Sequence, residues 1–151
     1  MPVFETSQII RTDLETCWNF FSDPSNLSII TPPEMKFTVM FPDPLPVMHQ
    51  GLIIRYRVSP LLNIPVNWIT EITHVRKYDY FVDNQLKGPF RLWHHQHLFR
   101  EVNQGIEIID IVNYELPFGK LGELAALWMV KRRILHIFNY RKTIIESRFG
   151  N

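Results

Sequence analysis

Residues 91–114 have the sequence RLWHHQHLFREVNQGIEIIDIVNY, and a period of two runs through both halves of it. Successive side chains of a β-strand point to opposite faces of the sheet, so this period predicts strands and not a helix. The predicted strands cover residues 90–100 and 106–115, and only the short segment 102–105 separates them. A connection this short makes neighbouring strands an antiparallel hairpin.

The predicted hairpin gathers polar side chains on one face. Alternate positions of its first strand carry two rings and two histidines, namely Trp93, His95, His97 and Phe99. A turn at residues 103–104 places His97 opposite Asp110, Trp93 opposite Tyr114 and His95 opposite Val112. Opposed side chains on one face have Cβ atoms about 5 Å apart. A buried His97–Asp110 pair of this kind would orient the imidazole and raise its basicity.

The period of two extends outward from the hairpin over most of the chain. Further strands are predicted at 3–10, 35–41, 51–59, 66–75 and 78–86. The short turn at 87–89 joins the last of these to the hairpin, which places Asp83 near Trp93 and Phe81 near His95. The sequence thus predicts a sheet of antiparallel strands.

Helical patterns interrupt the strands after the first strand and end the chain. Thr12 and Glu15 form a capping box that begins a first helix, and Asp23-Pro24 ends it and can begin a second, short one. The pattern from about 120 to 148 predicts a helix roughly 42 Å long, enough to lie across the whole sheet. The fold class is therefore α+β. If the sheet curves strongly, this helix leaves a cavity on the concave side.

Length and composition predict one ordinary globular domain covering residues 1–151. The net charge of +1 gives no reason to expect a nucleic-acid partner. The single cysteine, Cys17, excludes an internal disulfide and a cysteine-based zinc site, and its place in an apolar helical pattern predicts a buried structural thiol. The sequence has no signal peptide and no apolar run of about 18 residues, so we expect a cytoplasmic protein without membrane insertion.

Residues spread over nearly the whole chain resemble those of a known superfamily. They are Trp18–Phe21 with Asp23-Pro24 and Thr31-Pro32-Pro33, then Gly51, Trp68–Thr70, Phe81–Asp83, Gln85, Gly88–Phe90, the Trp93-x-His95-x-His97-x-Phe99 run, Asp110, Tyr114-x-x-Pro117-Phe118-Gly119, Gly122 and Phe138-x-Tyr140-Arg141. This pattern is similar to the START/Bet v 1-like (SRPBCC) superfamily, in its bacterial ligand-binding branch grouped with polyketide cyclases and dehydrases.

The resemblance implies a helix-grip fold. In that fold a curved seven-stranded antiparallel sheet wraps around a long C-terminal helix, and two short helices lie between strands 1 and 2. Members of the superfamily bind lipids, sterols, polyketides and other apolar molecules, and only some are enzymes. The resemblance therefore implies the fold more directly than an activity.

The leading hypothesis is a module that binds a small apolar molecule, such as a lipid, a polyketide-like or an aromatic compound, between the sheet and helix 120–148. The walls are expected to come from Trp68, Phe81, Trp93, Phe99, Tyr114, Trp128 and Phe138. Orientation of the ligand is expected from Asp83, His95, His97, Asp110 and Lys131. Lys131 falls near the middle of the apolar helix face, where it would meet an acidic ligand group, unless the helix bends or the side chain reaches a wet opening.

Two other functions remain open. A cyclase or dehydratase-type enzyme would use His97 or His95 as a general base, with Asp110 as its orienting partner. A domain with a filled core would act through protein contacts. The polar side chains of the hairpin would then only form hydrogen bonds with one another within the sheet. The chain has no phosphate-binding loop, nucleophile elbow or dinucleotide fingerprint, which argues against kinases, common hydrolases and dehydrogenases.

Two partner questions also arise from the pattern. His95 and His97 with Asp110 would give two imidazoles and a carboxylate, but a His-x-His pair is a weak signal, so we predict no metal and no cofactor. The long helix is apolar on more than one side, with Val130, Ile137 and Ile144 beside Arg133 and Arg141 on the side away from the cavity. A possible homodimer follows from this second apolar side.

Overall fold

The computed structural model describes residues 1–40, 46–60, 63–117 and 120–150. Within these residues, seven antiparallel strands form one sheet in the order β1-β7-β6-β5-β4-β3-β2. The strands are β1 (Val3–Ile10), β2 (Thr38–Val39), β3 (Ile53–Val58), β4 (Val66–Arg76), β5 (Tyr80–Lys87), β6 (Leu92–Val102) and β7 (Gly105–Glu115). The helices are α1 (Leu14–Phe21), the 3-10 turns η1 (Pro24–Ser28) and η2 (Pro33–Met35), and α2 (Lys120–Phe149).

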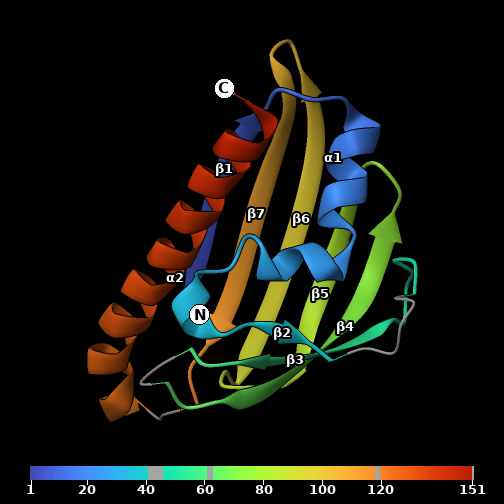
Figure 1. Ribbon diagram of the computed structural model, residues 1–151. Helices are drawn as coiled ribbons and strands as arrows, with labels where there is room; N and C mark the ends of the chain where they lie inside the picture. Colours follow the sequence, from blue (N-terminus) through green and yellow to red (C-terminus); the bar gives the residue numbers. More distant parts are fainter. Residues whose placement is uncertain (41–45, 61–62, 118–119, 151) are drawn as a thin grey trace.

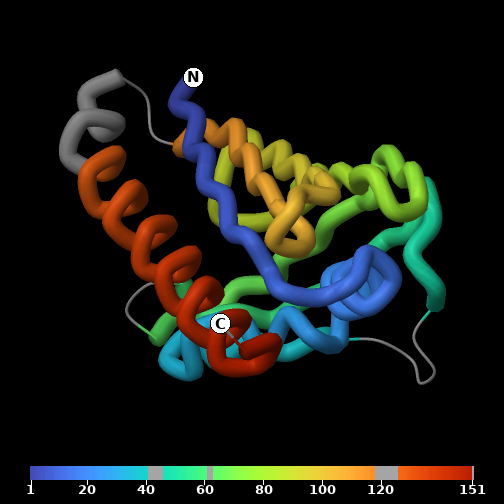
Figure 2. Tube along the Cα trace, turned by 90° about the horizontal axis from the view of Figure 1, so that it is seen from above, coloured from blue at the N-terminus to red at the C-terminus, as the bar shows by residue number. Residues whose placement is uncertain are grey.

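The sheet curls, and α2 runs along its open side, while α1 and the two 3-10 turns cover another part of the same concave face (Figure 1). The view from above shows α2 lying across the open side of the curled strands (Figure 2). This is the predicted helix-grip architecture, and the prediction of a curved seven-stranded sheet with a long C-terminal helix is confirmed. Among the described residues, no helix has both the length and the apolar character needed to cross a membrane.

The first helix begins one residue later than the capping box predicted. Asp13 is the N-cap, and its carboxylate accepts hydrogen bonds from the backbone N–H of Thr16 at 2.8 Å and from the Thr16 hydroxyl at 2.7 Å. The predicted Thr12–Glu15 box is therefore wrong. A carboxylate at the N-cap satisfies a free amide and also lies favourably at the positive end of the helix dipole. Asp23 begins η1 in the same way, through the amide of Ser25.

Strand bounds follow the prediction closely except at one edge. The predicted strand 35–41 is reduced to Thr38–Val39, because Pro33–Met35 form η2 and Lys36 takes a left-handed conformation with φ 48°. Residue 41 lies outside the described residues. Cys17 is fully buried as predicted, and burial raises the pKa of its thiol to about 12.

The central hairpin has the predicted register. His97 pairs with Asp110, and Trp93 pairs with Tyr114. Gly105 ends the turn with φ +139°, and a Cβ there would collide with the carbonyl oxygen of Ile10. Only glycine fits this position without strain, and this requirement fixes where the turn lies.

The neighbouring hairpin is shifted from the predicted register by two residues. Asp83 pairs with His95 instead of Trp93, and Phe81 pairs with His97 instead of His95. The connection is longer than predicted because the Gln85 side chain donates to the carbonyl oxygen of Phe90 at 2.7 Å and accepts from its amide at 3.3 Å. A shift of two keeps every side chain on its predicted face.

Candidate functional site

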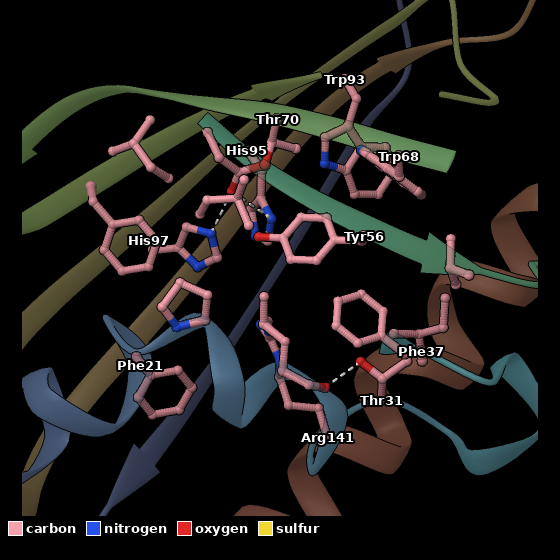
Figure 3. A pocket seen from close by; sticks show the side chains of 18 of the residues that line it. Phe21, Thr31, Phe37, Tyr56, Trp68, Thr70, Trp93, His95, His97 and Arg141 are labelled. Atoms are coloured by element: carbon pink, nitrogen blue, oxygen red, sulfur yellow. Dashed lines mark hydrogen bonds and ion pairs between the residues drawn. The ribbon is translucent and has the colours of Figure 1, made fainter. Parts of the chain in front are cut away.

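A cavity of about 170 Å³ lies between the curled sheet and α2 (Figure 3). Most of its lining is apolar, and the rings among the lining residues are Phe21, Phe37, Tyr56, Trp68, Phe81, Trp93 and Phe138. Strands β3 to β6 supply one wall and the middle of α2 supplies another. The expected space between a curved sheet and a long helix is therefore present.

One wall of the cavity carries a group of charged and polar side chains, which we call the polar cluster. It consists of Asp83 on β5, His95 and His97 on β6, Asp110 on β7 and Arg141 on α2. His95, His97, Asp110 and Arg141 are buried, and the side chain of Asp83 is 15% exposed. The alternation of the strands brings the two histidines and the two carboxylates to the concave face, and Arg141 reaches them from α2.

Each histidine of the polar cluster lies between the same two carboxylates. His95 donates from Nε2 to Asp110 Oδ1 at 2.9 Å, and His97 donates from Nε2 to Asp83 Oδ2 at 2.9 Å. The second nitrogens complete a ring of contacts, with His97 Nδ1 3.1 Å from Asp110 Oδ1 and His95 Nδ1 3.6 Å from Asp83 Oδ2. Arg141 donates to Asp110 Oδ1 at 3.1 Å. The predicted His97–Asp110 contact is thus present, but it has a weaker geometry than the His95–Asp110 hydrogen bond.

The two histidines differ in basicity because their surroundings differ. Burial, together with the neighbouring His97, lowers the pKa of His95 in spite of the carboxylates. Burial also opposes a charge on His97, but its contacts with Asp110 and Asp83 outweigh burial and raise its pKa. Burial alone would raise the pKa of Asp110, yet the Arg141 guanidinium and then the histidines hold it well below the usual range. The pKa of Asp83 is lowered too, since the hydrogen bond from His97 and the charges around it outweigh its burial.

These directions separate the two histidines. The two carboxylates have lowered pKa values beside Arg141 and beside His97, whose pKa is raised, whereas the lowered pKa of His95 favours its neutral form. A neutral His95 that donates through Nε2 keeps an unprotonated Nδ1. His95 is therefore better suited than His97 to accept a proton from a bound molecule.

Three buried polar atoms have no hydrogen-bond partner among the described residues. They are Trp68 Nε1, Thr70 Oγ1 and His97 Nδ1, and all three residues line the cavity. The Tyr56 hydroxyl points toward the histidines across the same space (Figure 3). Unpaired buried polar groups cost stability, and a bound molecule that pairs with them recovers this cost.

No family model matches the sequence, and no curated protein matches it. The Zhui aromatase/cyclase from Streptomyces sp. R1128 has a TM-score of 0.74 at 11% identity, with 97% of this chain and 92% of that chain covered. Ginseng major latex-like protein 151 from Panax ginseng has a TM-score of 0.70 at 12% identity, with 99% and 98% covered. The TTHA0849 protein from Thermus thermophilus has a TM-score of 0.70 at 18% identity, with 98% and 97% covered.

The chain has the helix-grip fold of START/Bet v 1-like proteins. Identities this low support the fold and leave the activity to be argued from the site. In this helix-grip protein the cavity lies where the sequence placed it. The predicted ligand residues that line it are Trp68, Phe81, Asp83, Trp93, His95, His97 and Phe138.

Five predicted ligand residues lie outside the cavity lining. Asp110 sits behind the histidines, while Phe99 and Tyr114 are buried in the core on either side. Trp128 is 64% exposed and packs against Arg132, and Lys131 is exposed as well. The placement of Trp128 and Lys131 at the cavity was wrong, because the described α2 side chains that line it are Ile134, Ile137, Phe138 and Arg141, further along the helix. Whether the exposed side of α2 forms a homodimer stays a prediction.

Sequence reasoning missed two features of the site. Arg141 was placed on the far side of the helix, yet it reaches Asp110 and lines the cavity. Its spacing of three from Phe138 and four from Ile145 puts it on the buried stripe of α2, a signal that the sequence already contained. Tyr56 was also missed, although it alternates with the exposed Arg55 and Arg57 and so had to face inward.

Proposed function

We propose that this protein binds one small, mainly apolar molecule in the cavity, with a hydrogen-bond acceptor of that molecule directed at the polar wall. The observation that carries the proposal is an apolar cavity whose wall contains buried polar groups without partners among the described residues. Binding pockets for small molecules combine an apolar lining with a few polar groups that fix orientation. The alternative of a filled core has no support, because the core of the described residues contains this cavity.

The volume of the cavity limits the size of its ligand. A dry cavity of about 150 Å³ accommodates a benzene-sized molecule. The cavity of this protein measures about 170 Å³. We therefore expect a compound of one or two rings and not a long acyl chain or a sterol.

The unpaired groups indicate which functional group the ligand carries. The indole Nε1–H of Trp68 can only donate, and the Thr70 hydroxyl can donate in the same region of the wall. The Asp83 carboxylate lies nearby and disfavours an anionic ligand. A neutral ring compound with a carbonyl or hydroxyl oxygen fits this combination best. The likeness to an aromatase/cyclase is compatible with such a ligand class.

Native mass spectrometry of the protein as purified, followed by solvent extraction, tests the proposal. We expect a co-purifying ring compound, or saturable binding of 2-acetylnaphthalene and weaker binding of 2-ethylnaphthalene, which lacks the acceptor oxygen. Trp68→Phe should reduce this difference, and Trp128→Phe, which changes an exposed ring, should not. Equal affinity for both probes in the wild type would show that the polar wall does not select the ligand.

A second candidate function is acid–base chemistry on the bound molecule. The observation that favours it is the His95–Asp110 hydrogen bond at 2.9 Å, which holds a neutral imidazole at the cavity. Because the pKa of His95 lies below 6.5, a reaction that uses it as a base should keep its rate from pH 6.5 upward and lose it at lower pH. Incubation of the extracted compound with wild type and with His95→Gln tests this. An unchanged compound after prolonged incubation with the wild type would leave binding as the function.

A further inference from the structure

We propose that Asp83, His95 and His97 form a binding site for one divalent transition-metal ion at the polar wall. Each residue offers one ligand atom, and the three atoms lie within 4.8 Å of one another. This set differs from the one that the sequence suggested, because Asp83 takes the place of Asp110. The inference goes beyond the binding of an apolar molecule and does not depend on it.

The distances from the Asp83 carboxylate to the two histidine nitrogens are close to those between neighbouring ligands of a metal ion. Nitrogen and oxygen ligands lie about 2.0–2.2 Å from zinc, so neighbouring ligands in tetrahedral or octahedral geometry are roughly 3.0–3.6 Å apart. Asp83 Oδ2 lies 2.9 Å from His97 Nε2 and 3.6 Å from His95 Nδ1. The hydrogen bond between Asp83 and His97 would be exchanged for two bonds to the metal with little movement of either side chain.

The second nitrogen of each histidine provides independent support. Histidines that bind metals usually donate their other N–H to a carboxylate or a carbonyl, which fixes the ring. His95 Nε2 already donates to Asp110 Oδ1, and Arg141 anchors that same oxygen. His97 Nδ1 is buried without a hydrogen-bond partner among the described residues, although Asp110 Oδ1 lies 3.1 Å away. Metal at Nε2 would place the proton of His97 on Nδ1, where a small rotation of the ring gives it a partner.

The ligands sit on rigid elements and leave room for a substrate or water. Asp83 and His95 are paired residues of β5 and β6, and all three ligand residues line the cavity. The unpaired hydroxyl of Thr70 belongs to the same lining and can bind a water held by the ion. Two imidazoles and one carboxylate suit Zn²⁺, Fe²⁺ or Co²⁺, whereas Mg²⁺ and Ca²⁺ prefer oxygen ligands.

The test is a titration of tag-free, chelator-treated full-length protein with Co²⁺, followed by its absorption bands and by calorimetry. We expect one equivalent to bind, with no comparable binding of Mg²⁺. His95→Gln and Asp83→Asn should weaken Co²⁺ binding at least tenfold, and Asp110→Asn should weaken it about 10–100-fold through the orientation of the histidines. His94→Gln is the matched control, since His94 points to the other face of β6 and contacts Asn84.

Surface histidines could also take up Co²⁺, so the variants decide the result. Circular dichroism and thermal melts show whether each variant is folded, and His97→Gln replaces any variant that is not. Binding of equal strength in wild type, His95→Gln and His97→Gln would overturn the proposal, as would a wild type that binds no Co²⁺ or Zn²⁺. Either result leaves the binding of ring compounds to be judged by its own probes.

Discussion

The concave face of the sheet has two ends, and side chains fill these two ends in different ways. Around α1, a packed end is formed by Ile10, Cys17, Trp18, Phe20, Phe21, Ile30, Phe81, Phe99, Ile106, Ile108 and Ile145. Its rings interlock, with Trp18 and Phe99 centroids 5.1 Å apart and Phe20 and Phe21 centroids 5.2 Å apart. At the other end, around the polar cluster, the side chains leave about 170 Å³ open.

Strand β6 runs through both ends and shows the difference between them. On the inner face of β6, Phe99 belongs to the packed end, whereas Trp93, His95 and His97 line the cavity. Helix α1 contributes Trp18, Phe20 and Phe21 to the packed end, but only Phe21 to the cavity lining. From this comparison we expect stability to depend mainly on one end of the strand and the proposed binding on the other. Rings at the packed end should matter for folding, and rings at the cavity should matter for binding.

The largest difference is expected from truncating one ring at each end. Phe99→Ala should destabilise the protein by about 3–5 kcal/mol, because it creates a void in a filled core. Trp93→Ala should cost at most about half as much, since it enlarges a space that is already open. Urea unfolding of the two variants measures the difference. Equal losses would mean that the two ends are packed alike.

The next effect concerns the contact between Arg141 and Asp110 in the polar cluster. Arg141→Met should cost about 3 kcal/mol, because it leaves the buried Asp110 carboxylate without its cation. Arg132→Met, at an exposed position, is the control and should cost little. Unfolding in urea at pH 7 measures both variants. If Arg141→Met lowers the free energy of unfolding no more than the control does, the histidines alone are enough to stabilise the charged Asp110.

The ion pair between Arg141 and Asp110 also predicts how the stability of the protein changes with pH. The native pKa of Asp110 is lowered below its ordinary value of 3.8, so the pair stabilises the fold above about pH 4 and loses this contribution as pH falls further. Arg141→Met should therefore flatten the acid limb of the stability curve. An unchanged acid limb in this variant would contradict the assignment of the shift to Arg141.

The smallest effects are expected from adding volume. Ile106→Phe at the packed end should cost about 1–3 kcal/mol through overpacking. Val58→Phe places its ring in the cavity and should change stability by less than about 0.5 kcal/mol. Thermal melts compare the two variants. A Val58→Phe variant as unstable as Ile106→Phe would argue that the cavity closes in solution.

Much of the fold could be predicted from the sequence because period, turn residues and length are local signals. The bounds of β1, the turn before Gly105 and the extent of α2 follow from such signals. The register of β5 against β6 was wrong by two residues, since it depends on how Gln85 binds the backbone of Phe90. No local pattern encodes a side chain reaching across a loop.

The site was predicted less completely because it depends on distances between elements. The sequence placed His95, His97 and Asp110 together, but it missed Arg141 and put Lys131 at the cavity. The error at Lys131 concerns how far α2 lies over the sheet, which a helical period does not give, whereas Arg141 could have been placed from its spacing to Phe138 and Ile145. Which histidine has the lower pKa depends on the exact set of buried neighbours, and only the three-dimensional arrangement supplies that set.

The most direct test of the cavity as a binding site is calorimetric titration of 2-acetylnaphthalene into wild type and Val58→Phe. Val58 is 2% exposed and lines the cavity, so the added ring should occupy the space that the ligand needs. The account predicts saturable one-to-one binding to the wild type and loss of binding in a variant that remains folded. Binding of equal affinity to the folded variant would contradict it.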